Sequence, residues 1–172
     1  VGIFLNYKTK ENEEILVRSG VSLVDMAGAR NNLKQELADP FGWDFEKVVD
    51  NARSVWDEYL GRIAIETDDY LQKKKFYTNL YRALAAKATW SDADGRFVDE
   101  DERIRQLEKP DDCIVSGEYW NTFWNNQQLF NLMAPEISSQ WARSAIQLYQ
   151  NSGWFNTDPA GIEHTGVMVA MH

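Results

Sequence analysis

Residues 116–154 read SGEYWNTFWNNQQLFNLMAPEISSQWARSAIQLYQNSGW and predict two consecutive helices joined by a tight turn. Pro135 disfavours helical backbone at the residue before it, so the first helix should end near Met133. The second helix should carry Glu136 in its first turn and end at Gly153, because glycine commonly follows the last helical residue. A helix, a short loop and another helix form the repeating unit of a helical toroid. This part of the chain therefore predicts a mainly α-helical fold.

The first of these helices, expected to begin near Trp120, mixes aromatic and amide side chains on one face. Steps of three and four residues bring together Trp120, Phe123, Trp124, Gln127 and Asn131. A helix that only packs a core would carry Leu or Val in place of the amides. Aromatic planes beside neutral hydrogen-bonding groups suit a sugar, which has apolar C–H faces and a rim of hydroxyls. The other interpretation is a tryptophan core with a solvated amide face, and periodicity alone leaves both open.

Five short motifs follow one another from this helix to the end of the chain. They are Trp-Asn-Thr-Phe at 120–123, Leu-Met-Ala-Pro-Glu at 132–136, Gly-Trp at 153–154, Ala-Gly-Ile-Glu at 160–163 and Gly-Val-Met-Val-Ala-Met-His at 166–172. This series resembles the start of the catalytic domain in family 92 glycoside hydrolases, the calcium-dependent exo-acting α-mannosidases. Upstream motifs extend the resemblance over nearly the whole chain.

The resemblance implies an incomplete (α/α)6 barrel of helical hairpins, preceded by a linker helix layer and a few strands from a β-sandwich. Residues 1–23 would be the terminal strands of that N-terminal β-sandwich. Residues 24–66 would be linker helices, and residues 67–172 would begin the truncated barrel of the catalytic domain.

Local patterns in the first half of the chain agree with that division. Residues 1–7 and 14–22 are apolar or alternating, which predicts two strands. The resemblance implies a helix at 26–38 after them. After a turn at 39–42, Asp44 should cap a helix with a broad apolar face that includes Trp56. Residues 63–66 could form a short strand. The next helix, capped by Thr67 or Asp68, should run to about Ala88.

Hydrolysis of a glycoside needs two carboxylates, an acid beside the leaving oxygen and a base that activates water. The residues alone offer Glu118, Asp158 and Glu163, of which Glu163 follows a glycine that lets backbone approach a ligand. The resemblance instead implies that the general acid, the general base and the main Ca²⁺ ligands lie beyond His172. It assigns sugar binding to Trp120, Asn121, Glu163 and His164 and no metal ligand to this segment.

Asn121 departs from the family pattern, because many members carry Asp at that position. An asparagine keeps one acceptor oxygen, replaces the other with a donor and removes the charge. This difference puts in doubt how tightly the same sugar hydroxyls are held.

The loop Ser-Asp-Ala-Asp-Gly-Arg-Phe at 91–97 also has two interpretations. Its Asp-x-Asp-Gly sequence could begin a calcium loop, but the other ligands of an EF-hand are not at their spacing. A turn with Gly95 at positive φ explains the pattern equally well. By resemblance, the loop lies at the rim of the active-site mouth.

Composition limits the kinds of molecule that the chain could bind. The 172 residues carry a net charge of −9, which argues against nucleic acid, and no apolar run approaches the roughly 18 residues of a membrane span. By resemblance we expect a mannose-containing glycan as substrate, the remainder of the same polypeptide as partner, and a location in the bacterial periplasm or outside the cell. The alternative is a non-catalytic carbohydrate-binding or structural helical module, because aromatics with amides suit both.

Overall fold

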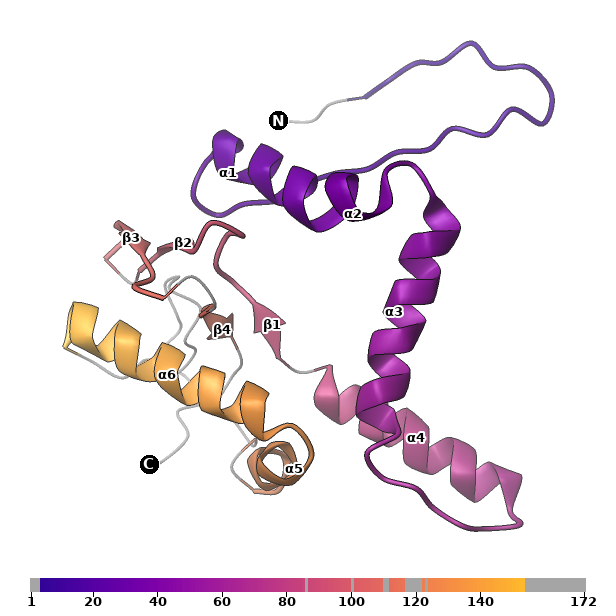
Figure 1. Ribbon diagram of the computed structural model, residues 1–172, viewed down its shortest axis with the longest axis vertical. Coiled ribbons are helices and arrows are strands. Elements are labelled where there is room, and N and C mark those ends of the chain that lie inside the picture. The colour runs from indigo at the N-terminus through magenta and orange to yellow at the C-terminus, as the bar shows by residue number, and fades with distance from the viewer. Residues whose placement is uncertain are drawn as a thin grey trace.

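A computed structural model describes residues 4–85, 87–99, 101–109, 112–116, 122 and 124–153. Helices dominate, and the strands in this part of the chain form two small antiparallel sheets (Figure 1). The predicted mainly helical fold is therefore confirmed. None of the described helices is both long and apolar enough to cross a membrane.

The N-terminal segment differs from the prediction of two strands. Residues 4–24 are extended and form no strand within the described chain, which makes the strand prediction wrong for this structure. A strand needs a neighbouring strand for its backbone hydrogen bonds, and here only a turn forms, in which the Glu13 N–H donates to the Lys10 carbonyl at 3.2 Å. Apolar side chains such as Phe4 and Val17 are exposed. The assignment of residues 1–23 to a sandwich, like the other domain bounds, stays a prediction.

The linker begins with three helical segments that run on from one another. They are α1 (Met26–Asn32), the π-helical η1 (Leu33–Ala38) and α2 (Asp39–Phe41), and Gly42 ends them with φ 58°. Asp25 caps α1 by accepting a hydrogen bond from the Gly28 N–H at 2.6 Å. The helix predicted at 26–38 is confirmed, and the expected turn at 39–42 instead extends it by three residues.

Helices α3 (Phe45–Leu60) and α4 (Tyr70–Leu84) form an elbow beside the rest of the molecule (Figure 1). Asp44 caps α3 as predicted, accepting from the Lys47 N–H at 3.1 Å. Asp69, rather than Thr67 or Asp68, caps α4 because its carboxylate reaches two orphan N–H groups. Residues 63–66 form no strand, so that prediction is wrong too.

The first core cluster holds α4 against the C-terminal helical hairpin. It consists of Leu80 and Leu84 from α4 with Phe130, Met133 and Ala134 at the turn between α5 (Asn126–Met133) and α6 (Pro135–Ser152). Trp56 packs against this cluster, and its ring lies 4.4 Å from that of Tyr81. Gly153 ends α6 with φ 80°, as predicted.

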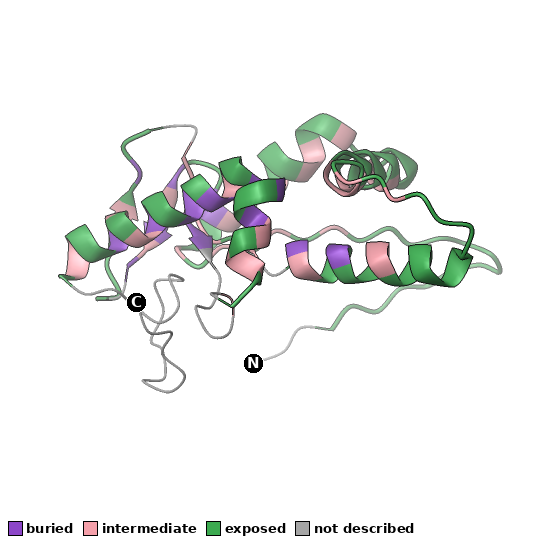
Figure 2. Cartoon of the chain, turned by 90° about the horizontal axis from the view of Figure 1, so that it is seen from below, coloured by how far each residue is buried: buried purple, intermediate pink, exposed green. Residues whose placement is uncertain are grey.

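The second core cluster lies between α6 and the strands. Strand β1 (Ala88–Thr89) pairs with β4 (Val115–Ser116), and β2 (Arg96–Val98) pairs with β3 (Ile104–Gln106). Figure 2 shows buried residues gathered along α6 and these strands, whereas α3 has no buried residue. The cluster contains Phe97, Leu107, Ile114 and Leu148, with Trp90 packed against it.

Candidate functional site

The residues predicted to bind sugar, Trp120, Asn121, Glu163 and His164, lie outside the described residues. The same holds for Glu118 and Asp158, the other carboxylates considered. Their convergence in one pocket therefore stays a prediction. The described chain shows the framework on either side of Trp120 and Asn121, which is β4 before them and α5 after them.

Helix α5 begins at Asn126, six residues later than the expected start at Trp120. Just before it, a turn brings the Gln127 N–H to the Thr122 carbonyl at 2.8 Å. The residue before the helix, Asn125, has φ −154° and makes no capping hydrogen bond with its side chain. Trp124 therefore precedes the helix and does not share a helical face with Gln127 and Asn131, whereas Trp120 and Phe123 of the predicted face lie outside the described residues.

Two amides of that face take part in contacts within the hairpin. Gln127 donates through Nε2 to Ser138 Oγ of α6 at 2.7 Å, and Ser138 in turn donates to Asn131. These contacts hold the two helices of the hairpin together. They engage one polar atom of each amide, and sugar binding by this face stays a prediction. Trp124, by contrast, is 70% exposed.

A pocket of about 630 Å³ opens between α4 and the start of α5. Most of the residues that line the pocket are apolar, and the others are three amides, Asn79, Asn125 and Asn126. Asn126 Oδ1 is buried there without a hydrogen-bond partner among the described residues. This pocket has the combination of apolar surface and amides that suits a sugar. Sequence analysis missed Asn79, whose only signal is its place one turn after Phe76 on α4. The full lining is Ile63, Phe76, Asn79, Leu80, Ala83, Asn125, Asn126 and Leu129.

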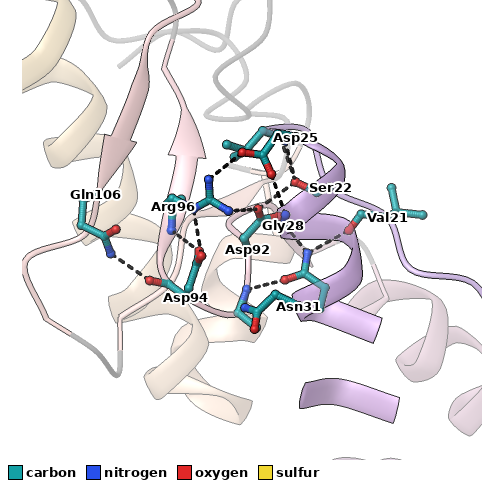
Figure 3. Close-up of polar contacts among 12 residues, drawn as sticks. Val21, Ser22, Asp25, Gly28, Asn31, Asp92, Asp94, Arg96 and Gln106 are labelled. Atoms are coloured by element: carbon teal, nitrogen blue, oxygen red, sulfur yellow. Dashed lines mark hydrogen bonds and ion pairs between the residues drawn. The ribbon is translucent and has the colours of Figure 1, made fainter. Parts of the chain in front are cut away.

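The loop at 91–97 packs against the N-terminus of α1 (Figure 3). Gly95 has φ 80°, which confirms the predicted turn. Arg96 forms ion pairs with Asp25 and Asp94, each at 2.8 Å. The hydrogen bond from Arg96 holds the pKa of Asp25 below its ordinary value. Burial pushes the pKa of Asp94 upward, but hydrogen bonds from the Arg96 side chain and backbone bring it below the ordinary value.

The described residues do not fit a calcium ion. Calcium takes about six to eight oxygen ligands, whereas the carboxylates of Asp92 and Asp94 both face the guanidinium of Arg96. In the part of the chain that the structure describes, no group of three His, Cys, Asp or Glu side chains could hold a metal ion. The Asp-x-Asp-Gly sequence therefore serves the turn and its ion pairs.

A further buried carboxylate, Asp99, lies in the turn between β2 and β3. It accepts from the Arg103 N–H at 2.9 Å and from Arg105 Nε at 2.5 Å. Burial raises the pKa of Asp99, but these hydrogen bonds outweigh it, and the pKa lies below the ordinary value. A carboxylate held ionised in this way is unsuited to act as a general acid, which needs a raised pKa.

The motif Leu-Met-Ala-Pro-Glu links the helical hairpin to the linker layer. Arg62, just after α3, donates through Nη1 to the Met133 carbonyl and to Glu136 Oε1, each at 2.6 Å. A second contact joins Arg62 Nη2 to Glu58 at 3.2 Å. Burial raises the pKa of Glu136. Its backbone hydrogen bond and the hydrogen bond from Arg62 lower the pKa by more, so it lies below the ordinary value.

We expect Glu136→Gln to lower the melting temperature (Tm) by a few degrees at pH 7, because Arg62 loses the nearer of its two charged partners. A carboxylate with a depressed folded-state pKa stabilises fully above its unfolded pKa, about 4.3 for Glu. The Tm difference from wild type should shrink below that pH and vanish below the folded-state pKa. Glu58→Gln, at the more exposed partner, should change Tm less. Thermal unfolding from pH 7 to 3 measures both, and a pH-independent difference would contradict the assignment.

Solved structures similar to this chain include a family GH92 α-mannosidase. A family GH92 α-mannosidase from Bacteroides thetaiotaomicron matches with a TM-score of 0.65 and 27% identity, over 76% of this chain and 17% of that chain. Its complex with mannoimidazole matches with a TM-score of 0.64 and 27% identity, over 76% and 16%. The GH92 family glycosyl hydrolase ccman5 shares the fold at a TM-score of 0.63 and 23% identity, over 74% and 17%.

The catalytic-domain model of glycosyl hydrolase family 92 matches residues 28–172, and the chain belongs to this family. A relative from Arthroderma benhamiae, described as an uncharacterized secreted glycosidase, is 31% identical over 88 residues. That match covers 48% of this chain and 11% of the relative. The chain thus spans a small part of the proteins it resembles, and the resemblance found in the sequence is confirmed.

Proposed function

We propose that this chain is part of a glycosidase that removes terminal α-linked mannose from glycans. The observation that carries the proposal is the family match, because its range of residues 28–172 includes every predicted sugar-binding residue. The similarity to an α-mannosidase supports mannose as the sugar. In this proposal Trp120 flanks the sugar ring, while Asn121, Glu163 and His164 hydrogen-bond its hydroxyls.

The reaction we propose is inverting. One carboxylic acid protonates the leaving oxygen while a carboxylate on the opposite side of the ring activates water. Among the described residues, Asp25, Asp94 and Asp99 have depressed pKa values and are paired with arginines. Such groups suit neither role, so none of these three is proposed as the acid or the base, which the proposal places beyond His172.

We also propose that the enzyme depends on calcium and acts outside the cytoplasm. The calcium ligands would come from other parts of the polypeptide, because Asp92 and Asp94 are committed to Arg96. The secreted relative from Arthroderma benhamiae supports an extracellular or periplasmic location.

The full-length protein should release mannose from α-linked mannobiosides, and the mannose should appear first as the β-anomer in time-resolved NMR spectra. EGTA should abolish the release and added Ca²⁺ should restore it. The 172-residue chain by itself should release none, because the acid and the base are expected elsewhere.

Each outcome bears on one part of the proposal. Initial formation of the α-anomer would contradict inversion, and activity that persists in EGTA would contradict calcium dependence. Mannose binding without hydrolysis by the full-length protein would favour the non-catalytic carbohydrate-binding module instead.

A further inference from the structure

Asp92 is a buried carboxylate that joins the loop at 91–97 to the linker helix α1. Its side chain is 3% exposed. Oδ2 accepts from Ser22 Oγ at 2.7 Å (Figure 3). Oδ1 accepts from Asn32 Nδ2 at 2.8 Å. Arg96 adds an ion pair at 3.9 Å. A buried carboxylate is costly unless such partners surround it, so its position is tightly specified.

The contact between Asp92 and α1 is also sterically close. A Cβ atom added to Gly28 would lie 2.1 Å from Asp92 Oδ2 and 2.7 Å from Ser22 Oγ. Only glycine at this place in α1 lets the carboxylate approach. Asn32 completes the contact, because its Oδ1 accepts from the Ala93 N–H at 2.8 Å. The loop is therefore fixed to α1 through the backbone of Ala93 and the side chain of Asp92.

Residues just before Asp92 form hydrogen bonds with β4 and the residue before it, and the chain continues from β4 to the predicted sugar-binding segment. The Trp90 N–H donates to the Ile114 carbonyl at 2.7 Å, and the Ile114 N–H donates to Ser91 Oγ at 3.1 Å. Thr89 then pairs with Val115 in the β1–β4 ladder. Each of these contacts involves a residue no more than three positions before Asp92 in the chain.

The same strand is held from its other side by α6. Ser144 Oγ accepts from the Val115 N–H at 2.9 Å and donates to the Cys113 carbonyl at 3.1 Å. Strand β4 is thus placed between two supports, α6 through Ser144 and α1 through Asp92. Trp120 and Asn121 follow in the chain only four and five residues after Ser116.

We propose that Asp92 is a positioning residue: by fixing residues 88–92 against α1, it places the β1–β4 ladder from which the chain continues to Trp120 and Asn121. The inference rests on the proposed function in that these two residues bind the sugar. Asp92 itself is not expected to contact the substrate. Its effect on turnover passes through the backbone of β4.

The test compares Asp92→Asn and Gly28→Ala in the full-length protein with two matched controls. Asp92→Asn removes the charge that faces Arg96, and Gly28→Ala separates the same surfaces without removing a polar group. Asp99→Asn alters another buried aspartate, and Gly42→Ala strains a positive-φ glycine that has nothing within 4 Å of its added Cβ. Ser22→Ala is a milder variant that removes one hydrogen bond to Asp92, for use if the first two do not fold.

Hydrogen exchange at the Trp90 and Ile114 amides is the first measurement, and kinetics on an α-mannobioside is the second. In the Asp92 and Gly28 variants, exchange should be about tenfold faster or more, because the ladder opens locally. KM should rise about tenfold with kcat within about threefold, since displaced binding groups contact substrate and transition state alike. The controls should lower Tm and leave both readouts near wild type.

Unchanged exchange in the variants, or equal changes in the controls, would overturn the inference. Faster exchange with an unchanged KM would show a purely structural role and overturn it as well. Wild-type protein without activity on any α-mannoside would refute the proposed function, and exchange would then still decide whether Asp92 places the ladder.

Discussion

In the full-length protein, Asn121→Ala and Glu163→Gln should each lower kcat/KM for an α-mannoside by tenfold or more. Each removes a hydrogen-bond partner from a desolvated sugar hydroxyl, at a cost of about 1–3 kcal/mol. About 1.4 kcal/mol in the transition-state free energy corresponds to tenfold in rate. Steady-state kinetics gives the ratio, and thermal unfolding should show little loss of stability, because both side chains are proposed to contact the sugar.

Two exposed positions on α3 provide matched controls. Asn51→Ala and Glu46→Gln make the same chemical changes on a helix outside the predicted sugar-binding segment and should leave kcat/KM unchanged. Wild-type kcat/KM in both Asn121→Ala and Glu163→Gln would contradict their assignment as sugar-binding residues. Coordinates placing Asn121 and Glu163 on opposite faces of the domain would refute their convergence without any kinetics.

Phe130→Ala should have the largest effect on stability, lowering the free energy of unfolding by about 3–5 kcal/mol. Phe130 is 1% exposed and lies in the first core cluster, where α4 meets the α5–α6 turn. Truncating its ring removes apolar contacts and leaves a cavity between three helices that cannot close fully. Denaturant unfolding measures the loss.

Leu132 offers the control, because it lies two residues away on the same helix and is 84% exposed. Leu132→Ala should change the free energy of unfolding by no more than about 0.5 kcal/mol. A small effect of Phe130→Ala, comparable to that of Leu132→Ala, would mean that the α4–α5 contact does not stabilise the fold.

Features that depend on neighbouring residues in the chain could be predicted well. Asp44 caps α3, Pro135 separates α5 from α6, and Gly153 ends α6, because each acts on backbone groups within a few residues. The start of α5 was less predictable. The side chain of Asn125 makes no capping hydrogen bond, so no cap marks this boundary in the sequence.

The sequence motifs predicted the family of the protein, but the roles of individual amide side chains could not be predicted from spacing. Gln127 and Asn131 have the residue types of a sugar-binding face, yet each forms a hydrogen bond with Ser138 on the next helix. Asn79, in contrast, has as its sequence signal only its place one turn after Phe76, and it lines a pocket because α4 lies beside α5. The partners of an amide come from other elements, so its role cannot be decided by its spacing along one helix.

Residue order alone predicts the helical class, the Asp44 cap, the Gly95 turn and the family, since these depend on local backbone preference and on motifs in order. The roles of the polar residues depend on contacts between distant parts of the chain. Asp92 and Asp94 have the pattern of a calcium loop, but Arg96 and α1 engage them, and residues 4–24 have strand patterns without a strand partner in the described chain. In both cases the free energy of a polar group depends on which partner reaches it after folding. That partner lies far away in the sequence, as Ser22 and Asn32 lie about 60 to 70 residues from Asp92.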